Sequence, residues 1–186
     1  MPQLIVPDTS YLASYVDALA RGWSPETLRR EDATGEHILR IESAPMRFIR
    51  SLDDPEGLGP PIELPDGSAI PRLPSITRWV WADEFAGSIN LRWQKGTSAL
   101  PEAVLGHIGF SIVPWCRGRG LATFALGQML PEAKKQGLGR VELTTSIDNV
   151  ASQRVLLANG AELIGRFTRD SSCGCSEALR YRIDLS

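Results

Sequence analysis

The sequence has few of the features that mark extracellular or membrane proteins. It contains three cysteines in 186 residues, an odd number in a chain too long to need disulfides for its stability, which favours a reducing compartment. No apolar run approaches the roughly 18 residues of a membrane span. The first residues lack the basic flank and the long apolar core of a secretion signal. We therefore expect a cytoplasmic protein that makes no membrane contact.

Positive charge and clusters of metal ligands are also scarce. Lys and Arg number 20 against 22 Asp and Glu, a net charge of −2, whereas a general nucleic-acid binder needs a basic face. Cys173 and Cys175 lie close together, but two thiols with no histidine nearby do not make a zinc site. We expect neither a nucleic acid nor a metal ion as a partner. The length fits one domain, residues 1–186.

The most informative stretch joins a strand to a helix through a loop with two glycines. Apolar residues alternate with small or polar ones over residues 108–112, which predicts a strand with two different faces, and Pro114 ends its pairing. In the loop that follows, residues 117–122, glycines let the backbone turn tightly where a helix begins. Backbone N–H groups at a helix start attract anions, and Arg117 and Arg119 add positive charge. The loop is either a phosphate site or only a tight connection.

Two common nucleotide-binding loops do not fit this stretch. A Walker loop needs the run G-x-x-x-x-G-K-[ST], which the sequence does not contain. A dinucleotide fingerprint needs a third glycine, whereas Gly118 and Gly120 are followed by Leu121, Ala122 and Thr123. Neither nucleotide interpretation is supported.

The loop does resemble a motif of one enzyme superfamily. The run Arg117-x-x-Gly120-x-Ala122 after an apolar strand is similar to the R/Q-x-x-G-x-G/A motif of the GNAT superfamily of acyl-CoA-dependent N-acyltransferases, whose loop amides hold the pyrophosphate of coenzyme A. A second motif agrees, because residues 149–161 resemble the N-x-x-S-x-R-V-L helix of that family, which ends in Asn-Gly. The resemblance covers about residues 79–185 and looks nearest to uncharacterised bacterial members.

The resemblance implies a fold of class α/β (α+β). In the GNAT fold a single mixed, mostly antiparallel sheet is flanked by helices, and its two central strands splay apart. Residues 1–76 would supply N-terminal helices and a loop on the acceptor side, and residues 77–186 the acetyl-CoA-binding core. The family contacts coenzyme A through its first central strand, the glycine loop and the start of the last helix. The matching residues here are Ile112, Val113, Arg117, Gly118, Arg119, Gly120, Leu121, Ala122, Asn149 and Ser152.

Hydrophobic periodicity and turn residues predict the individual elements. A first helix is expected from a cap at Asp8 or Ser10 to Gly22, and a second, short helix from Ser24, with Pro25 in its first position. These two helices would form a wall of the acceptor site. Strands are expected over residues 4–6, 77–82, 88–93, 141–147, 161–168 and 177–185.

Prolines mark two further places. Pro131 lies within the helix that follows the glycine loop, and we expect it to kink or break that helix near Leu130. Residues 53–74 are rich in Pro and Gly, which makes regular structure improbable there. This loop either lies over the acceptor cleft or is a solvated insertion.

Acetyl transfer to an amine requires a proton acceptor, and His107 is the candidate general base. The alternation of the strand places it beside small residues, and the ordinary pKa of histidine suits proton removal near neutral pH. The alternative is a structural histidine that fixes the preceding loop by hydrogen bonds. Glu84 and Glu102 are weaker candidates because both are expected in loops.

The remaining catalytic needs follow from the resemblance. The backbone N–H of Ile112 or Val113 would stabilise the oxyanion. Many members place a tyrosine on the last helix to protonate the leaving thiolate, but Leu156 stands at that position here. This departure leaves a general acid in doubt, although a thiolate can leave without one.

The function that these features imply is N-acetyltransferase activity. The protein would bind acetyl-CoA and an amine together, and the amine would attack the thioester directly. The acceptor is a small molecule or, alternatively, a protein N-terminus or lysine, and a homodimer is left open. Because of Leu156, a second hypothesis is a catalytically weak acyl-CoA-binding or regulatory module with the same fold.

Overall fold

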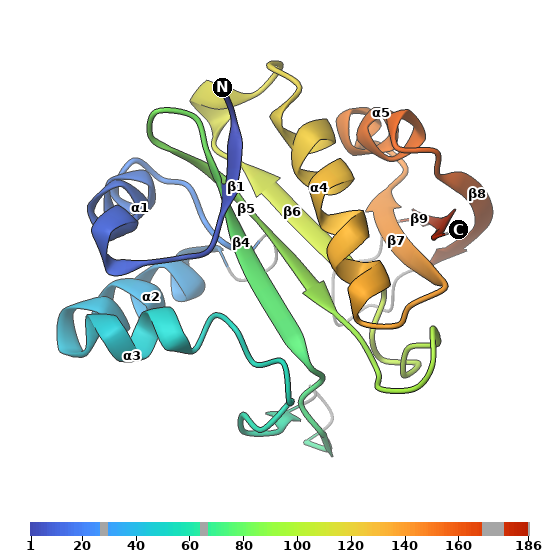
Figure 1. Ribbon diagram of the computed structural model, residues 1–186, viewed down its shortest axis with the longest axis horizontal. Helices are drawn as coiled ribbons and strands as arrows, with labels where there is room; N and C mark the ends of the chain where they lie inside the picture. Colours follow the sequence, from blue (N-terminus) through green and yellow to red (C-terminus); the bar gives the residue numbers. More distant parts are fainter. Residues whose placement is uncertain (27–29, 64–66, 169–176, 186) are drawn as a thin grey trace.

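Two antiparallel sheets form the framework of the molecule (Figure 1). The computed structural model describes residues 1–26, 30–63, 67–168 and 177–185. The first sheet has the order β1-β4-β5-β6 and consists of β1 (Gln3–Ile5), β4 (Ser75–Trp81), β5 (Phe85–Arg92) and β6 (Ile108–Ile112). The second has the order β7-β9-β8 and consists of β7 (Arg140–Ser146), β8 (Glu162–Thr168) and β9 (Glu177–Asp184).

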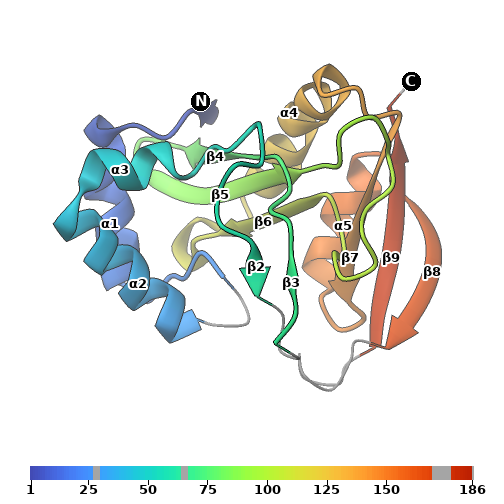
Figure 2. The same cartoon turned by 90° about the horizontal axis from the view of Figure 1, so that it is seen from below.

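Helices flank the sheets on two sides (Figures 1 and 2). The N-terminal group consists of the 3₁₀ turn η1 (Thr9–Tyr11) and the helices α1 (Leu12–Ala20), α2 (Arg30–Ser43) and α3 (Pro45–Arg50). The other group consists of α4 (Leu121–Lys135), α5 (Val150–Ala158) and the 3₁₀ turn η2 (Pro114–Cys116). A small hairpin of β2 (Ile62–Glu63) and β3 (Ala69–Ile70) lies below the first sheet in Figure 2.

The central strands β6 and β7 belong to different sheets and are joined at one point. The backbone N–H of His107, just before β6, donates to the carbonyl of Glu142 in β7 at 2.7 Å. In return, the N–H of Glu142 donates to Nδ1 of the His107 ring at 2.9 Å. No ladder pairs β6 with β7 in the described residues. The predicted splaying of the central strands is therefore confirmed.

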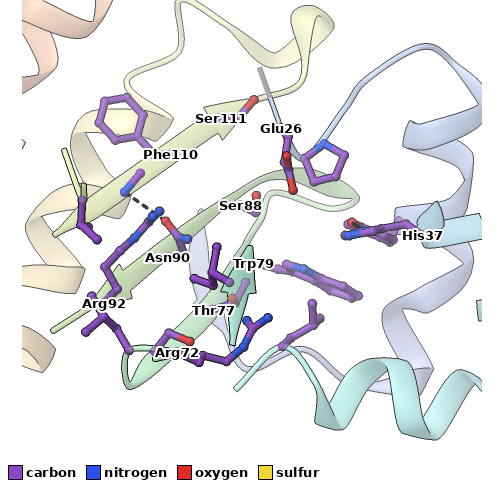
Figure 3. Close-up of a pocket in the computed structure, with 18 residues that line it drawn as sticks. Glu26, His37, Arg72, Thr77, Trp79, Ser88, Asn90, Arg92, Phe110 and Ser111 are labelled. Atoms are coloured by element: carbon purple, nitrogen blue, oxygen red, sulfur yellow. Dashed lines mark hydrogen bonds between the residues drawn. The ribbon is translucent and has the colours of Figure 1, made fainter. Parts of the chain in front are cut away.

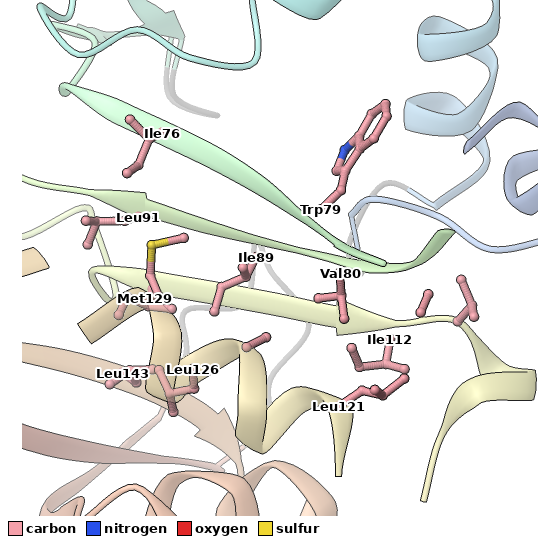
Figure 4. Packing of buried hydrophobic residues seen from close by; sticks show 14 of the residues in the cluster. Ile76, Trp79, Val80, Ile89, Leu91, Ile112, Leu121, Leu126, Met129 and Leu143 are labelled. Atoms are coloured by element: carbon pink, nitrogen blue, oxygen red, sulfur yellow. The ribbon is translucent and has the colours of Figure 1, made fainter. Parts of the chain in front are cut away.

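One part of the hydrophobic core lies between the first sheet and α4 (Figure 4). Ile89 and Leu91 of β5 are fully buried there against Leu126 and Met129 of α4. Full burial of each such side chain stabilises the fold by about 1.5–3 kcal/mol. Trp79 of β4 points to the opposite face. The N-terminal helices cover that opposite face of the sheet.

Most predicted elements are confirmed, and three expectations about helices and loops are wrong. Residues 24–26 are not helical, and α2 is described only from Arg30, followed by an unforeseen α3. The helix α4 continues through Pro131 to Lys135, so no break occurs near Leu130. The buried Met129 and Ala133 pack on either side of the proline and outweigh the hydrogen bond that it removes.

The third wrong expectation concerns residues 53–74, which contain the β2–β3 hairpin instead of irregular structure alone. Residues 64–66 within that loop, and the predicted loop with Cys173 and Cys175, lie outside the described residues. In the part of the chain that is described, no group of His, Cys, Asp or Glu could hold a metal ion. No helix found there is long and apolar enough to cross a membrane.

Candidate functional site

The glycine loop has the geometry of an anion site. Gly118 and Gly120 adopt φ angles of 75° and 74°, a left-handed conformation that favours glycine. The helix α4 starts directly after them, and the N–H groups of Leu121, Ala122 and Thr123 have no hydrogen-bond partner in the described residues. Three free donors and the positive end of a helix dipole favour a phosphate group.

Both predicted arginines lie beside these donors. The Nε of Arg117 donates to the carbonyl of Ile112 at 3.1 Å, which holds the base of its side chain against β6. Nη1 of Arg119 lies 3.8 Å from Sγ of the buried Cys116. The two arginines are exposed, so their positive charge is directed at solvent around the loop.

The backbone of β6 distinguishes Ile112 from Val113. The N–H of Val113 donates to the carbonyl of Ala86 at 3.0 Å and is therefore engaged. In an antiparallel pair the backbone groups of successive residues point alternately toward and away from the partner strand. Those of Ile112 therefore point away from β5, and its carbonyl accepts from Arg117. Of the two, only Ile112 directs its N–H toward the opening between β6 and β7.

Asn149 and Ser152 lie at the start of α5. The side-chain oxygen of Asn149 accepts from the backbone N–H of Ser152 at 3.1 Å, so Asn149 caps the helix. The capping role is thus observed directly. The other end of α5 is held beside the start of α4, because Nδ2 of Asn159 donates to the carbonyl of Thr123 at 3.3 Å. The two helices lie side by side in Figure 1.

A cavity of about 590 Å³ lies on the other face of the first sheet, under the N-terminal helices (Figure 3). Its floor consists of residues of β4, β5 and β6, and Ile62, Arg72 and Leu73 contribute to its rim. The lining residues are Tyr15, Pro25, Glu26, His37, Leu52, Ile62, Arg72, Leu73, Ser75, Thr77, Trp79, Ser88, Asn90, Arg92, Val104, Gly109, Phe110 and Ser111.

One wall of the cavity is aromatic and fixed by hydrogen bonds. The rings of Tyr15 and Trp79 stack with centroids 4.7 Å apart. The Tyr15 hydroxyl shares a hydrogen bond of 2.7 Å with Nδ1 of His37, and burial raises the pKa of the Tyr15 phenol, which stays protonated. Nε1 of Trp23 donates to Oγ of Ser111 at 3.0 Å. This network ties the N-terminal helices to β6.

Sequence reasoning missed His37, Arg92 and Asn90, which the fold brings into the same cavity. His37 is one of the two histidines in the chain, and that scarcity was the available signal. Arg92 and Asn90 alternate with Ile89 and Leu91 along β5. The alternating polar residues of β5 indicate that one face of the strand is not part of the core. Only the fold shows that this face lines a cavity.

His107 lies at the junction of the two sheets and does not line the cavity. Its side chain is 1% exposed, and burial, with the charges of Arg140 and Arg92, lowers the pKa of its imidazole. Because Nδ1 accepts from Glu142, the neutral ring carries its proton on Nε2. Nε2 has no partner among the described residues. This arrangement favours the positioning role over that of a general base.

The other catalytic candidates are also outside the cavity. Glu84 is half exposed, and its carboxylate lies 3.7 Å from Nη1 of Arg21. Glu102 is exposed in a loop. Leu156 is 1% exposed, so its side chain belongs to the core beside α4. None of these three residues is among those that line the cavity.

Comparisons with known proteins agree on one family. The family model described as an acetyltransferase (GNAT) domain matches residues 68–162. Comparison of the sequence with curated proteins found no significant match. Solved structures, in contrast, share the fold over nearly the whole chain.

Three of these structurally similar proteins are described here. A GNAT-family acetyltransferase from Streptococcus pneumoniae has a TM-score of 0.65 at 16% identity, and the match covers 100% of both chains. The microcin C7 self-immunity acetyltransferase MccE, in complex with acetyl-CoA and AMP, has a TM-score of 0.64 at 13% identity over 98% of this chain and 92% of MccE. An acetyltransferase from Salmonella typhimurium that modifies the N-terminal serine of ribosomal protein L7/L12 has a TM-score of 0.60 at 13% identity over 100% of this chain and 95% of its own.

Proposed function

This chain belongs to the GNAT family of acetyltransferases, and we propose that it transfers the acetyl group of acetyl-CoA to the primary amine of a small molecule. The observation that carries the proposal is the placement of two sites on opposite sides of β6. The free N–H groups of α4 lie on one side, and the lined cavity lies on the other. A thioester at the edge of β6 would be open to an amine from the cavity.

The residues around the glycine loop fit the phosphate end of acetyl-CoA. The N–H groups from Gly118 to Ala122 would hold the pyrophosphate, with charge from Arg117 and Arg119. The left-handed φ angles of the two glycines support this assignment, because they keep the donors uncovered. Asn149 and Ser152 would lie along the pantetheine arm, in addition to their observed capping contact.

The edge of β6 would stabilise charge during the reaction. We assign the oxyanion donor to the N–H of Ile112, since that of Val113 is bonded to Ala86. The amine nitrogen attacks the thioester carbon, the C–S bond breaks, and its electron pair leaves with sulfur as a thiolate. Leu156 has no proton to give, so coenzyme A leaves as the thiolate.

The proton of the amine must pass to a base, and His107 is poorly placed to accept it. Its Nδ1 is occupied by Glu142 and its ring is buried. We therefore assign His107 a positioning role at the junction of the sheets. Glu26 and His37 line the cavity and carry groups that can accept a proton directly or through water.

The size of the cavity supports a small acceptor. Small-molecule sites commonly enclose about 300–1,000 Å³, and the cavity of about 590 Å³ lies within that range. Tyr15 of α1, His37 of α2 and Arg72, which precedes β4, line it on different sides. A protein N-terminus or lysine is the alternative acceptor, and the Salmonella relative named above modifies an N-terminal serine.

Ligand-induced stabilisation tests the cofactor site. Acetyl-CoA should raise the melting temperature of the wild type by mass action, and ATP and NADH should do so much less. Gly120→Val should abolish the shift, because a branched side chain at a left-handed position distorts the loop. Gly137→Val is the matched control, since Gly137 has φ 82° and lies at the other end of α4. An unchanged shift in Gly120→Val would mean that the loop is only a connection.

Turnover tests the reaction itself. Release of free thiol from acetyl-CoA should rise when an acceptor amine is added, and a mixture of small amines and peptides identifies the class. The second candidate function, an acyl-CoA-binding module without turnover, is favoured by Leu156, which is buried where many members have tyrosine. Tight binding of acetyl-CoA without thiol release on any amine would support that candidate.

A further inference from the structure

Arg92 is a half-buried cation whose guanidinium has no partner among the described residues. It lies at the end of β5, and its side chain lines the cavity beside Asn90 (Figure 3). Its guanidinium makes no hydrogen bond and no ion pair within 4 Å to any described residue. Burial lowers the pKa of Arg92, although the group stays charged, and the Glu26 carboxylate attracts it only from a longer distance.

Other arginines around the first sheet are engaged with the protein. Nη1 of Arg78 donates to both carboxylate oxygens of Asp53, at 3.0 and 2.8 Å. Nε of Arg72, at the rim of the cavity, donates to the carbonyl of Pro60 at 3.1 Å. A desolvated charge without a counter-ion is unfavourable, and buried charges are normally paired. Arg92 is half-buried and therefore differs from Arg72 and Arg78 in having no such partner among the described residues.

The surroundings of Arg92 leave space for that partner. Gly109 on β6 has no side chain, and a Cβ there would lie 3.8 Å from Nη2 of Arg92 and 2.9 Å from Oδ1 of Asn90. The same Oδ1 accepts the backbone N–H of Gly109 at 3.1 Å. The adjacent floor carries hydroxyl groups from Ser75, opposite Arg92 in the strand register, and from Thr77.

We propose that Arg92 binds an anionic group of the acceptor, so that the substrates are small amines that also carry a carboxylate or a phosphate. The proposal rests on the proposed acetyltransferase function and specifies the acceptor of the same site. A guanidinium offers a planar pair of donors that matches both anions. The hydroxyl groups of Ser75 and Thr77 supply further donors. The apolar body of such a molecule would pack against Trp79.

Matched substrates test the proposal. Acetylation of 4-aminobutanoate is compared with that of 4-aminobutanamide, in which a neutral amide replaces the carboxylate, and 2-aminoethyl phosphate is compared with ethanolamine. The wild type should favour the anionic member of at least one pair by on the order of 10²-fold in kcat/KM. The pair that shows the preference distinguishes carboxylate from phosphate.

Variants of Arg92 identify the residue responsible. Arg92→Gln should reduce the preference to about one, and Arg92→Lys should keep part of it, because the charge remains but the planar fork is lost. Arg47→Gln, at an exposed position of α3, is the control and should keep the full preference. Equal rates for both members of each pair in the wild type, or an unchanged preference in Arg92→Gln, would overturn the proposal.

A binding measurement separates this proposal from the proposed function. In the presence of coenzyme A, 4-acetamidobutanoate or N-acetyl-2-aminoethyl phosphate should raise the melting temperature of the wild type more than the neutral products do. Arg92→Gln should lose that difference, and Arg92→Lys should keep part of it. If neither anionic product stabilises the wild type more than its neutral counterpart, the Arg92 proposal fails, whatever the turnover. If no amine releases thiol and acetyl-CoA does not stabilise the protein, the acetyltransferase proposal fails.

Discussion

Replacement of His107 separates its structural role from a catalytic one. Nδ1 accepts the N–H of Glu142 at 2.9 Å inside the protein, where water cannot replace it. His107→Leu removes the acceptor with little change of volume and leaves that N–H without a partner. His107→Asn retains an acceptor, because its side-chain oxygen can occupy the place of Nδ1. If His107 positions β6 against β7, the two variants should differ in stability.

The loss of unfolding free energy expected in His107→Leu can be estimated. A buried donor left without an acceptor costs about 1–3 kcal/mol. The Nε2 of wild-type His107 has no partner among the described residues and already costs part of that amount, so we expect a net loss near the lower end. For a protein of this size, 1 kcal/mol shifts the melting temperature by about 2–4 °C. His107→Asn should stay within about 1 kcal/mol of the wild type.

The pH dependence of stability provides a second, independent test of the structural role of His107. Burial holds the pKa of folded His107 below its ordinary value of 6.5, so the unfolded chain takes up the proton first as the pH falls. The histidine therefore favours the folded state fully above about pH 6.5, and that contribution is lost as the pH falls toward the folded pKa. His107→Leu lacks this dependence. Its deficit relative to the wild type should narrow in acid.

Urea denaturation followed by circular dichroism, at pH 7.5 and 5.5, measures these stabilities. The pH profile of thiol release measures the catalytic alternative in the same proteins. A positioning role predicts that His107→Asn keeps kcat/KM within a few-fold. A His107→Asn protein of normal stability that loses about 10²-fold or more in kcat/KM, with a displaced acid limb, would refute the reasoning and identify His107 as the base.

Two further substitutions test positions near the cofactor site. Gly87 has φ 155°, and a Cβ there would lie 2.3 Å from the carbonyl oxygen of Ser111. Gly87→Ala should therefore destabilise the fold by about 2–4 kcal/mol in urea denaturation, and a loss below 0.5 kcal/mol would contradict the close approach of β5 and β6. Asn149→Asp keeps the helix cap and should leave the melting temperature unchanged. We expect calorimetry to show weaker acetyl-CoA binding in that variant, whereas unchanged affinity would mean that Asn149 only caps α5.

The glycine loop and the strands were predictable because their signals are local. The alternation over residues 108–112 reports burial of one face, whatever lies far away in the chain. The left-handed conformation of Gly120 is likewise a property of a few consecutive residues. Pro131 shows the limit of such reasoning. The local effect of a proline is to interrupt a helix, but the packing of α4 against the sheet overrides it.

The cavity was less predictable because its residues are distant in sequence. His37 and Arg92 reach it from α2 and β5, which are separated in the chain by α3 and by the strands β2, β3 and β4. The role of His107 depends on Glu142, which lies 35 residues later in the chain. A period of two places His107 on a face of its strand but does not say whether that face meets a ligand or another strand.

The junction at His107 also explains how β6 can separate two sites. Beyond it, β6 has no ladder with β7, although β5 and β6 stay in register from Ile108 to Ile112. The edge of β6 that faces β7 therefore lacks ladder hydrogen bonds, each of which contributes about 1 kcal/mol net. The backbone groups of Ile112 on this edge can bond another partner instead. The pair of bonds between His107 and Glu142 limits the opening to the end of β6 that adjoins the glycine loop. In our proposal, acetyl-CoA lies along this edge, which places its thioester between the N–H of Ile112 and the cavity that contains Arg92.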